Sequence, residues 1–207
     1  MKVAVLVSGG GTNLQAMLDR IDEKKLTGVE ISVVIASNSK AYALERAKKK
    51  QIPTAVISKK AYTSLEAYDE AMLMSLQDFG AELVVAAGFL SMVGARVLRY
   101  YENRVINVHP SLIPSFCGKG MYGIKPHEAA IEKGVKISGA TVHFLNEVYD
   151  EGPILHQKAV EVFPEDTPEA LQERIMTECE QVILPEAIQW IADGRVKIEN
   201  GRVVIEK

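Results

Sequence analysis

Lys2-Val3-Ala4-Val5-Leu6-Val7-Ser8-Gly9-Gly10-Gly11-Thr12-Asn13 is the stretch that decides the fold class of this chain. Its apolar run, residues 3–7, has strand length and is typical of a strand buried on both faces of a parallel sheet. Three glycines end the run, and apolar residues then recur at positions 14, 17, 18 and 21 with helical spacing. We therefore expect a helix that begins at Thr12 or Asn13, with one of these side chains as its N-terminal cap.

The same alternation of strand and helix continues through the first half of the chain. We expect strands at 31–36, 54–57, 83–87 and 104–108, and helices at 41–50, 64–79 and 93–100. Strands that alternate with helices predict βαβ units with right-handed connections. The expected fold is therefore α/β, an open, mainly parallel twisted sheet with helices on both faces, as in Rossmann-like proteins.

The second half of the chain begins with an aperiodic segment. Residues 109–125 contain two prolines and three glycines and are expected to form a long loop, which inside a compact domain is usually functional or disordered. The expected elements after it are a helix at 126–133, strands at 139–145 and 154–163, a helix at 167–192, and a C-terminal β-hairpin that turns at Asn200-Gly201. No linker or repeat interrupts the chain, so we expect a single domain over 1–207.

Composition and charge exclude several classes of function. The 207 residues are 47% apolar and 25% charged, which is typical of a globular domain. A formal net charge of −3 gives no basic surface for nucleic acid. The apolar run at the N-terminus is too short for a signal peptide or a membrane span, and Cys117 and Cys179 have no paired spacing. We expect a cytoplasmic protein with reduced thiols and with no nucleic-acid or membrane partner.

The glycines between the first strand and the first helix form a candidate anion site. Gly9, Gly10 and Gly11 allow the backbone to turn tightly and to present its N–H groups beside the positive end of a helix. No Gly-Lys-Ser/Thr follows, as a Walker A loop requires, and Leu14 stands where a G-x-G-x-x-G motif needs its third glycine. The alternative is a tight turn that binds nothing. We favour a phosphate site, since a turn needs fewer glycines.

A second candidate lies at the end of the strand 104–108. Asn107 and His109 leave the same side of this strand, at the carboxyl edge of the sheet where ligands bind in open α/β folds. An amide beside an imidazole can stabilise an oxygen that gains negative charge in acyl transfer. Taken alone, the residues slightly favour a structural interpretation, in which Asn107 orders the following loop and His109 is a hydrogen-bonded core histidine.

Asp150 is the third candidate. An acidic residue before glycine and proline is usually a turn former, yet a carboxylate is also what orients an imidazole in catalytic triads. His143 lies on a strand and is expected to be a core or hydrogen-bonded histidine, whereas His127 and His156 have no identifiable partner and are expected at the surface or behind the site. No G-x-S-x-G nucleophile and no cluster of metal ligands is present in the sequence.

Three segments resemble one family. Residues 5–16 are similar to the opening of glycinamide ribonucleotide formyltransferases, and residues 107–114 to the catalytic segment shared by folate-dependent formyltransferases. Residues 138–144, followed by 150–154, are similar to the segment that carries the catalytic aspartate of that family. The resemblance covers nearly the whole chain, in order and at compatible spacing.

The resemblance implies a mechanism and assigns roles. Asn107, His109 and Asp150 would be the catalytic residues, with His143 and Ser111 as their support. The amine of glycinamide ribonucleotide would attack the formyl carbon of 10-formyltetrahydrofolate, which is the co-substrate, and no metal would take part. His109, kept protonated by Asp150, would stabilise the tetrahedral oxyanion together with Asn107, and an ordered water would carry the proton between the two nitrogens.

The resemblance also implies which residues bind the two substrates. Residues 1–100 would be the phosphate-binding half and residues 101–207 the catalytic and folate-binding half. Glu180 would hold the ribose hydroxyls. The phosphate would be bound by Gly10, Gly11, Thr12 and Asn13, and the folate by Phe89, Leu90, Ser91, Met92 and Val93 together with Asn107 and Asp150.

Three features depart from the family pattern. Ser91 stands where many relatives carry arginine, so a contact to the folate tail is expected to be missing. The loop after Pro114, residues 115–123, is longer than in the enterobacterial type. The helix around 176–180 holds an extra residue, which affects the assignment of Glu180.

Other functions remain open at this stage. Formyltetrahydrofolate hydrolases share the three catalytic residues but usually carry an additional N-terminal domain, and methionyl-tRNA formyltransferases add a C-terminal barrel, so chain length disfavours both. A non-catalytic phosphate-binding module would need only the glycine loop. A nicotinamide-dependent reductase is disfavoured by the failed fingerprint spacing. The expected partners are small molecules, and the expected state is a monomer or a homodimer.

Overall fold

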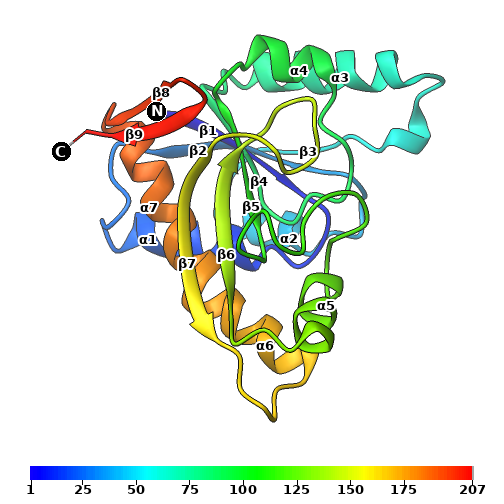
Figure 1. Cartoon of the computed structure of the whole chain (residues 1–207). Coiled ribbons are helices and arrows are strands. Elements are labelled where there is room, and N and C mark those ends of the chain that lie inside the picture. The colour runs from blue at the N-terminus through cyan, green and yellow to red at the C-terminus, as the bar shows by residue number, and fades with distance from the viewer. Residues whose placement is uncertain (207) are drawn as a thin grey trace. The chain divides into compact units, whose positions relative to one another are not determined.

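Seven strands form one sheet in the order β3-β2-β1-β4-β5-β6-β7 in the computed structural model, which describes residues 1–206 (Figure 1). A separate two-stranded sheet, β8-β9, follows near the C-terminus. Backbone contacts divide the chain into two units, Met1–Ile106 and Asn107–Lys207. This is the α/β architecture that the sequence predicts, with the expected C-terminal hairpin.

The first unit is built from βα repeats. Its elements are β1 (Lys2–Val7), α1 (Thr12–Asp22), β2 (Glu30–Ala36), α2 (Ala43–Lys49), β3 (Thr54–Val56), the 3-10 helix η1 (Lys59–Ala61), α3 (Leu65–Asp78), β4 (Leu83–Ala86) and α4 (Ala95–Tyr100). Strand β1 pairs in parallel with both β2 and β4, and β2 pairs in parallel with β3. Residues 3–7 of β1 are completely buried, as expected of a strand covered on both faces.

Connection handedness places the helices of the first unit on two faces of its strands. From β1 the chain moves outward to β2 and β3, and it then returns across the sheet to β4 on the other side of β1. Right-handed crossovers therefore put α1 and α2 on one face and α3 and α4 on the opposite face. Figure 1 shows these two pairs of helices on opposite sides of the strands.

The second unit combines two long strands with four helical segments. Its elements are β5 (Val105–His109, which begins just before the boundary), α5 (Lys125–Lys133), β6 (Ile137–Phe144), β7 (Ile154–Glu161), α6 (Pro168–Ile175), η2 (Met176–Glu180), α7 (Gln181–Ala192), β8 (Val196–Glu199) and β9 (Arg202–Ile205). Strands β6 and β7 are antiparallel, and α6, η2 and α7 pack along them (Figure 1).

Two local expectations need correction. The N-cap of α1 is Gly11, in the left-handed conformation with φ of 71°, and neither Thr12 nor Asn13 caps the helix. The long helix expected over 167–192 contains a π-helical turn, η2, between α6 and α7. A π turn accommodates one additional residue in a helix, and it lies where the sequence holds an extra residue.

Asp69 on α3 supports α4 from outside that helix. Its carboxylate is buried and accepts hydrogen bonds from the backbone N–H of Arg96 at 2.8 Å and of Val97 at 3.4 Å. These N–H groups belong to the first turn of α4, whose own N-cap, Gly94, has no capping side chain. A Cβ at Gly94 would lie 2.2 Å from the Asp69 carboxyl carbon, so the contact requires glycine.

We expect Asp69→Ala to lower the free energy of unfolding by about 1–2 kcal/mol, because the substitution removes the cap of α4. Urea denaturation followed by circular dichroism measures this change. Asp78→Ala, at the exposed C-terminal end of the same helix, is the matched control and should alter stability by less than about 0.5 kcal/mol. Equal effects of the two substitutions would contradict the capping role.

Candidate active site

The glycine loop follows β1 at the point where strand order reverses. Strands β1 and β4 are neighbours, and the connections that follow them run to opposite sides, which is where open α/β sheets bind ligands. Ser8 joins these two connections. Its N–H donates to the carbonyl of Gly88 at 3.0 Å, and its hydroxyl accepts from the N–H of Leu90 at 2.8 Å.

The loop ends in a helix N-terminus without acidic residues. The first turn of α1 carries no Asp or Glu, so the positive end of the helix dipole is not neutralised by its own side chains. Gly10 is exposed, Gly11 and Thr12 are half-buried, and Asn13 is buried. This arrangement suits an anion, which is the ligand that the sequence indicates.

The segment after β4 exposes apolar side chains. Leu90 is 64% exposed and Met92 is 40% exposed, whereas Val93 is buried. The Tyr68 hydroxyl hydrogen-bonds with Ser91 and donates to the carbonyl of Met92 at 3.3 Å. Exposed apolar groups beside fixed backbone groups can cover an aromatic ring and pair with its polar edge.

Asn107, His109, His143 and Asp150 gather in the second unit. Asn107 and His109 come from the end of β5, His143 from β6, and Asp150 from the loop between β6 and β7. The Nδ1 atom of His109 lies 3.8 Å from Asp150 Oδ2, and the Nε2 atom of His143 lies 3.6 Å from Asp150 Oδ1. The structure therefore brings together all three residues that the sequence singled out for acyl transfer.

His143 has a defined protonation state. Its Nδ1 lies 3.0 Å from the carbonyl of Phe144, which can only accept, so Nδ1 carries the proton. Burial lowers the pKa of His143, while nearby Asp150 opposes that shift, so the ring is neutral at pH 7. Its Nε2 then accepts from the Nδ2 amide of Asn107 at 3.2 Å. This bond fixes the direction of the Asn107 amide.

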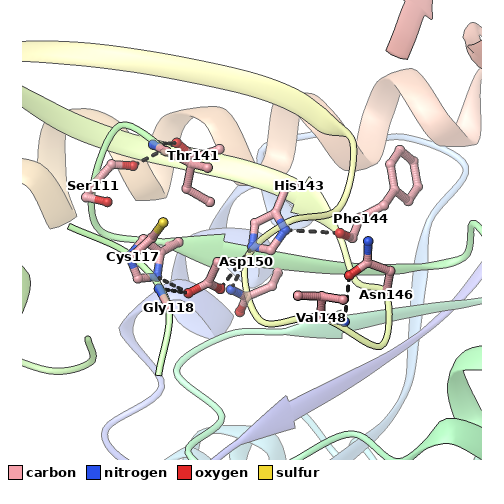
Figure 2. Close-up of polar contacts among 12 residues, drawn as sticks. Ser111, Cys117, Gly118, Thr141, His143, Phe144, Asn146, Val148 and Asp150 are labelled. Atoms are coloured by element: carbon pink, nitrogen blue, oxygen red, sulfur yellow. Dashed lines mark hydrogen bonds and ion pairs between the residues drawn. The ribbon is translucent and has the colours of Figure 1, made fainter. Parts of the chain in front are cut away.

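Backbone groups of the loop after β5 contact the same residues. His109 Nε2 donates to the carbonyl of Phe116 at 3.0 Å, and the N–H of Gly118 donates to Asp150 Oδ2 at 2.7 Å. Figure 2 shows Asp150 between Gly118 and His143. The sequence did not identify Phe116 or Gly118, because a backbone contact leaves no side-chain signature.

Ser111 and Thr141 anchor the start of that loop. The Ser111 hydroxyl donates to the carbonyl of Ser115 at 2.6 Å, and the Thr141 hydroxyl donates to the carbonyl of Ser111 at 2.7 Å (Figure 2). Ser111, Thr141 and His143 are all completely buried. Ser111 thus shapes the backbone of the loop after β5.

His127 was expected at the surface or behind the site, and the structure excludes the surface. It lies on α5, on the same buried face as Ala130, and is 1% exposed. Neither ring nitrogen has a hydrogen-bond partner within residues 1–206. Burial, with a smaller effect from His109, lowers its pKa to about 4. Its spacing of three residues from the apolar Ala130 is the only local sequence signal that could have indicated burial on α5.

Three further residues considered in the sequence are Glu180, His156 and Cys117. Glu180 is half-buried at the end of the π-helical turn η2. His156 is partly exposed and contacts Glu186 at 3.0 Å and the Trp190 ring. Burial raises the pKa of Cys117, and Asp150 adds to the effect, so this thiol is not activated.

Within residues 1–206, no group of three or more His, Cys, Asp or Glu side chains is placed to hold a metal ion. Each helix in this part of the chain is too short or too polar to cross a bilayer.

Comparison with known proteins gives consistent matches. Residues 1–188 match the family model described as formyl transferase. The chain is 35% identical over 201 residues to the phosphoribosylglycinamide formyltransferase of Escherichia coli, covering 97% of this chain and 92% of that protein. It is 39% identical to the trifunctional purine biosynthetic protein adenosine-3 of Bos taurus over 98% of this chain, but it spans only 19% of that protein's length.

A solved structure is similar over the whole chain. The glycinamide ribonucleotide transformylase 1 of Symbiobacterium toebii superposes with a TM-score of 0.93 and is 42% identical, covering 100% of this chain and 94% of that one. The fold of the Symbiobacterium toebii protein therefore matches the fold of this chain from β1 to the C-terminal hairpin.

His127 predicts a pH-dependent stability. Its folded pKa, about 4, is below the unfolded value of 6.5, so stability is fully present above pH 6.5 and is lost as pH falls toward 4. Between pH 7.5 and 5.0 we expect a loss of about 2 kcal/mol from this group. His127→Leu should remove that loss in urea denaturation, whereas the partly exposed His156→Gln should retain it. An unchanged pH dependence in His127→Leu would contradict the assignment.

Proposed function

The chain belongs to the formyl transferase family, and on that premise we propose that it transfers the formyl group of 10-formyltetrahydrofolate to the amine of glycinamide ribonucleotide. The products are formylglycinamide ribonucleotide and tetrahydrofolate, and the reaction is a step of de novo purine biosynthesis. The observation that supports this most directly is the gathering of Asn107, His109 and Asp150 around one point in the second unit.

The two polar residues from β5 supply the oxyanion donors. The substrate amine attacks the formyl carbon, and negative charge develops on the formyl oxygen. Asn107 gives one amide N–H to His143, and its other N–H remains for that oxygen. His109 Nε2–H, which donates to the Phe116 carbonyl in this structure, becomes the second donor when the formyl oxygen takes the place of that carbonyl.

Asp150 has two tasks in this proposal. Its carboxylate faces Nδ1 of His109, so it can orient the imidazole and compensate positive charge on the ring as the oxyanion forms. It also accepts from the Gly118 backbone, which fixes the carboxylate orientation. An ordered water carries the proton from the attacking amine to the departing nitrogen of the folate. No metal takes part in any step.

Substrate binding is proposed for both units. In the first unit, Gly10, Gly11, Thr12 and Asn13 bind the phosphate of the ribonucleotide, and residues 89–93 bind the folate. In the second unit, Asn107 and Asp150 are the proposed folate-binding residues. The exposed apolar side chains of Leu90 and Met92 support this assignment. We describe the protein as one formyltransferase domain, with a phosphate-binding half, 1–100, and a catalytic and folate-binding half, 101–207. It acts in the cytoplasm as a monomer or homodimer.

Glu180 is proposed to hold the ribose hydroxyls. We expect Glu180→Ala to raise the KM for glycinamide ribonucleotide about tenfold or more, because a carboxylate–hydroxyl pair contributes roughly 1.5–3 kcal/mol. The KM for the formyl folate should not change. Glu178→Ala, an exposed acid in the same π-helical turn, is the control. An unchanged KM for the ribonucleotide would remove Glu180 from the site.

The decisive experiment follows the formation of tetrahydrofolate from 10-formyltetrahydrofolate, with and without glycinamide ribonucleotide. We expect turnover that requires the ribonucleotide. His109→Ala should lower kcat by roughly a hundred- to a thousandfold, because one oxyanion donor is lost. Asp150→Asn should cause a comparable loss, because it removes the negative charge that faces the His109 imidazole. His156→Gln, outside the cluster, is the control for the loss of a histidine.

The other outcomes separate the alternatives. Tetrahydrofolate formed without the ribonucleotide would identify a formyltetrahydrofolate hydrolase instead. Ribonucleotide binding without turnover under either condition would leave a non-catalytic phosphate-binding module. Full activity in His109→Ala would refute the proposed mechanism while leaving the reaction intact.

A further inference from the structure

We infer that Arg46 on α2 is a positioning residue of the phosphate site, acting through the backbone of the glycine loop. Its Nε donates to the carbonyl of Gly10 at 2.8 Å, and its Nη1 donates to the side-chain oxygen of Gln15 at 2.9 Å. The guanidinium also stacks over the Tyr42 ring at 5.2 Å. Two of these contacts hold the half-buried side chain against the loop and against α1, and the third is to the N-cap residue of its own helix.

Carbonyls of two successive peptides in the loop point to α2. The N–H of Ala43 donates to the carbonyl of Gly9 at 3.1 Å, next to the Arg46 contact with Gly10. In a planar trans peptide the C=O and the following N–H point in opposite directions. Fixing the carbonyls of Gly9 and Gly10 therefore turns the N–H groups of Gly10 and Gly11 away from α2.

These two N–H groups have no acceptor within residues 1–206. They are adjacent, and Gly11 is in the left-handed conformation, which is the backbone pattern of an anion-binding nest. The close packing of α2 makes the arrangement specific, because a Cβ at Gly11 would lie 2.6 Å from the Cβ of Ala43. Gly11 is thus required both for its positive φ and for the approach of α2.

The charge of Arg46 adds to the same effect. No carboxylate of the described chain lies within ion-pair distance of its guanidinium, whereas the neighbouring Lys48 and Lys50 pair with Glu45 and Asp22. Gln15 accepts a hydrogen bond from Arg46 through its side-chain oxygen, and its Nε2 donates one to the carboxylate of Asp19 at 2.7 Å. The positive charge beside the loop is therefore available to an anion. Nothing in the sequence motif indicated Arg46, because it lies more than thirty residues after the loop.

This inference rests on the proposed function, since it concerns how the same site holds a phosphate. Inorganic phosphate is the first probe, titrated into the whole protein while backbone amides are followed by NMR. We expect the Gly10 and Gly11 amide signals to shift, with affinity at least tenfold weaker in Arg46→Gln. Lys49→Gln loses the same charge from the same helix and the same aromatic ring but contacts no loop residue, so it should bind like the wild type.

Kinetics provide the second test. Arg46→Gln should lower kcat/KM at least tenfold for glycinamide ribonucleotide and leave it unchanged for glycinamide riboside, which lacks the phosphate. Equal losses for both substrates would show a purely structural role and overturn the inference. Arg46→Lys keeps the charge but cannot hold Gly10 and Gln15 together in the same way, so it should bind phosphate at least threefold more weakly than the wild type.

The two proposals fail separately. If the wild type transfers no formyl group, the proposed function is lost, and the phosphate titration still decides the role of Arg46. If the wild type is active but Arg46→Gln and Arg46→Lys bind phosphate as tightly as the wild type does, only the present inference is overturned. If Arg46→Gln does not fold, the phosphate affinity of Arg46→Lys still tests the inference.

Discussion

The hydrogen bonds of Ser8 are the interaction on which the first unit depends. Its N–H and hydroxyl join the segment after β4, through Gly88 and Leu90, and its carbonyl accepts from the Asn38 amide at 2.9 Å after β2. The hydroxyl also contacts the Ser37 hydroxyl at 2.7 Å. One serine thus ties together the three connections that leave the carboxyl edge of β1, β2 and β4. The glycine loop begins at the next residue, so its course starts from a fixed point.

The two units carry different kinds of chemistry. The first unit offers backbone N–H groups, a helix N-terminus and a guanidinium, which suit a ligand of permanent negative charge. The second unit offers a neutral histidine, a second imidazole and a carboxylate, whose protonation states set which groups donate. Burial keeps His143 neutral, its carbonyl contact places the proton on Nδ1, and the free Nε2 orients Asn107. Groups of fixed charge or fixed polarity are thus concentrated in the first unit, and groups that can gain or lose a proton in the second.

Much of the fold was predictable because it follows from periodicity. Buried runs such as 3–7 and the Asn200-Gly201 turn have strong local signals, and the structure confirms them. The predicted cap of α1 was wrong because the N-cap position must be glycine to let Ala43 pack closely against it. This is a tertiary constraint that no local pattern contains. Clustering of the polar side chains could be expected from strand ends. Contacts from Phe116, Gly118 and Asp69 could not be, since they depend on how a loop or a neighbouring helix folds back.

The π-helical turn η2 lets its helix carry one more residue without losing its alignment. A residue in an α-helix advances the side-chain direction by about 100°, so an inserted residue would turn everything after it unless it were absorbed locally. The wider turn at 176–180 absorbs it, and the buried face of α7, which includes Ile183, Leu184 and Ile188, still packs against β6 and β7. Deleting one residue there would restore regular α-helical bonding and leave that face in place, so this turn is a point at which the chain tolerates a change in length.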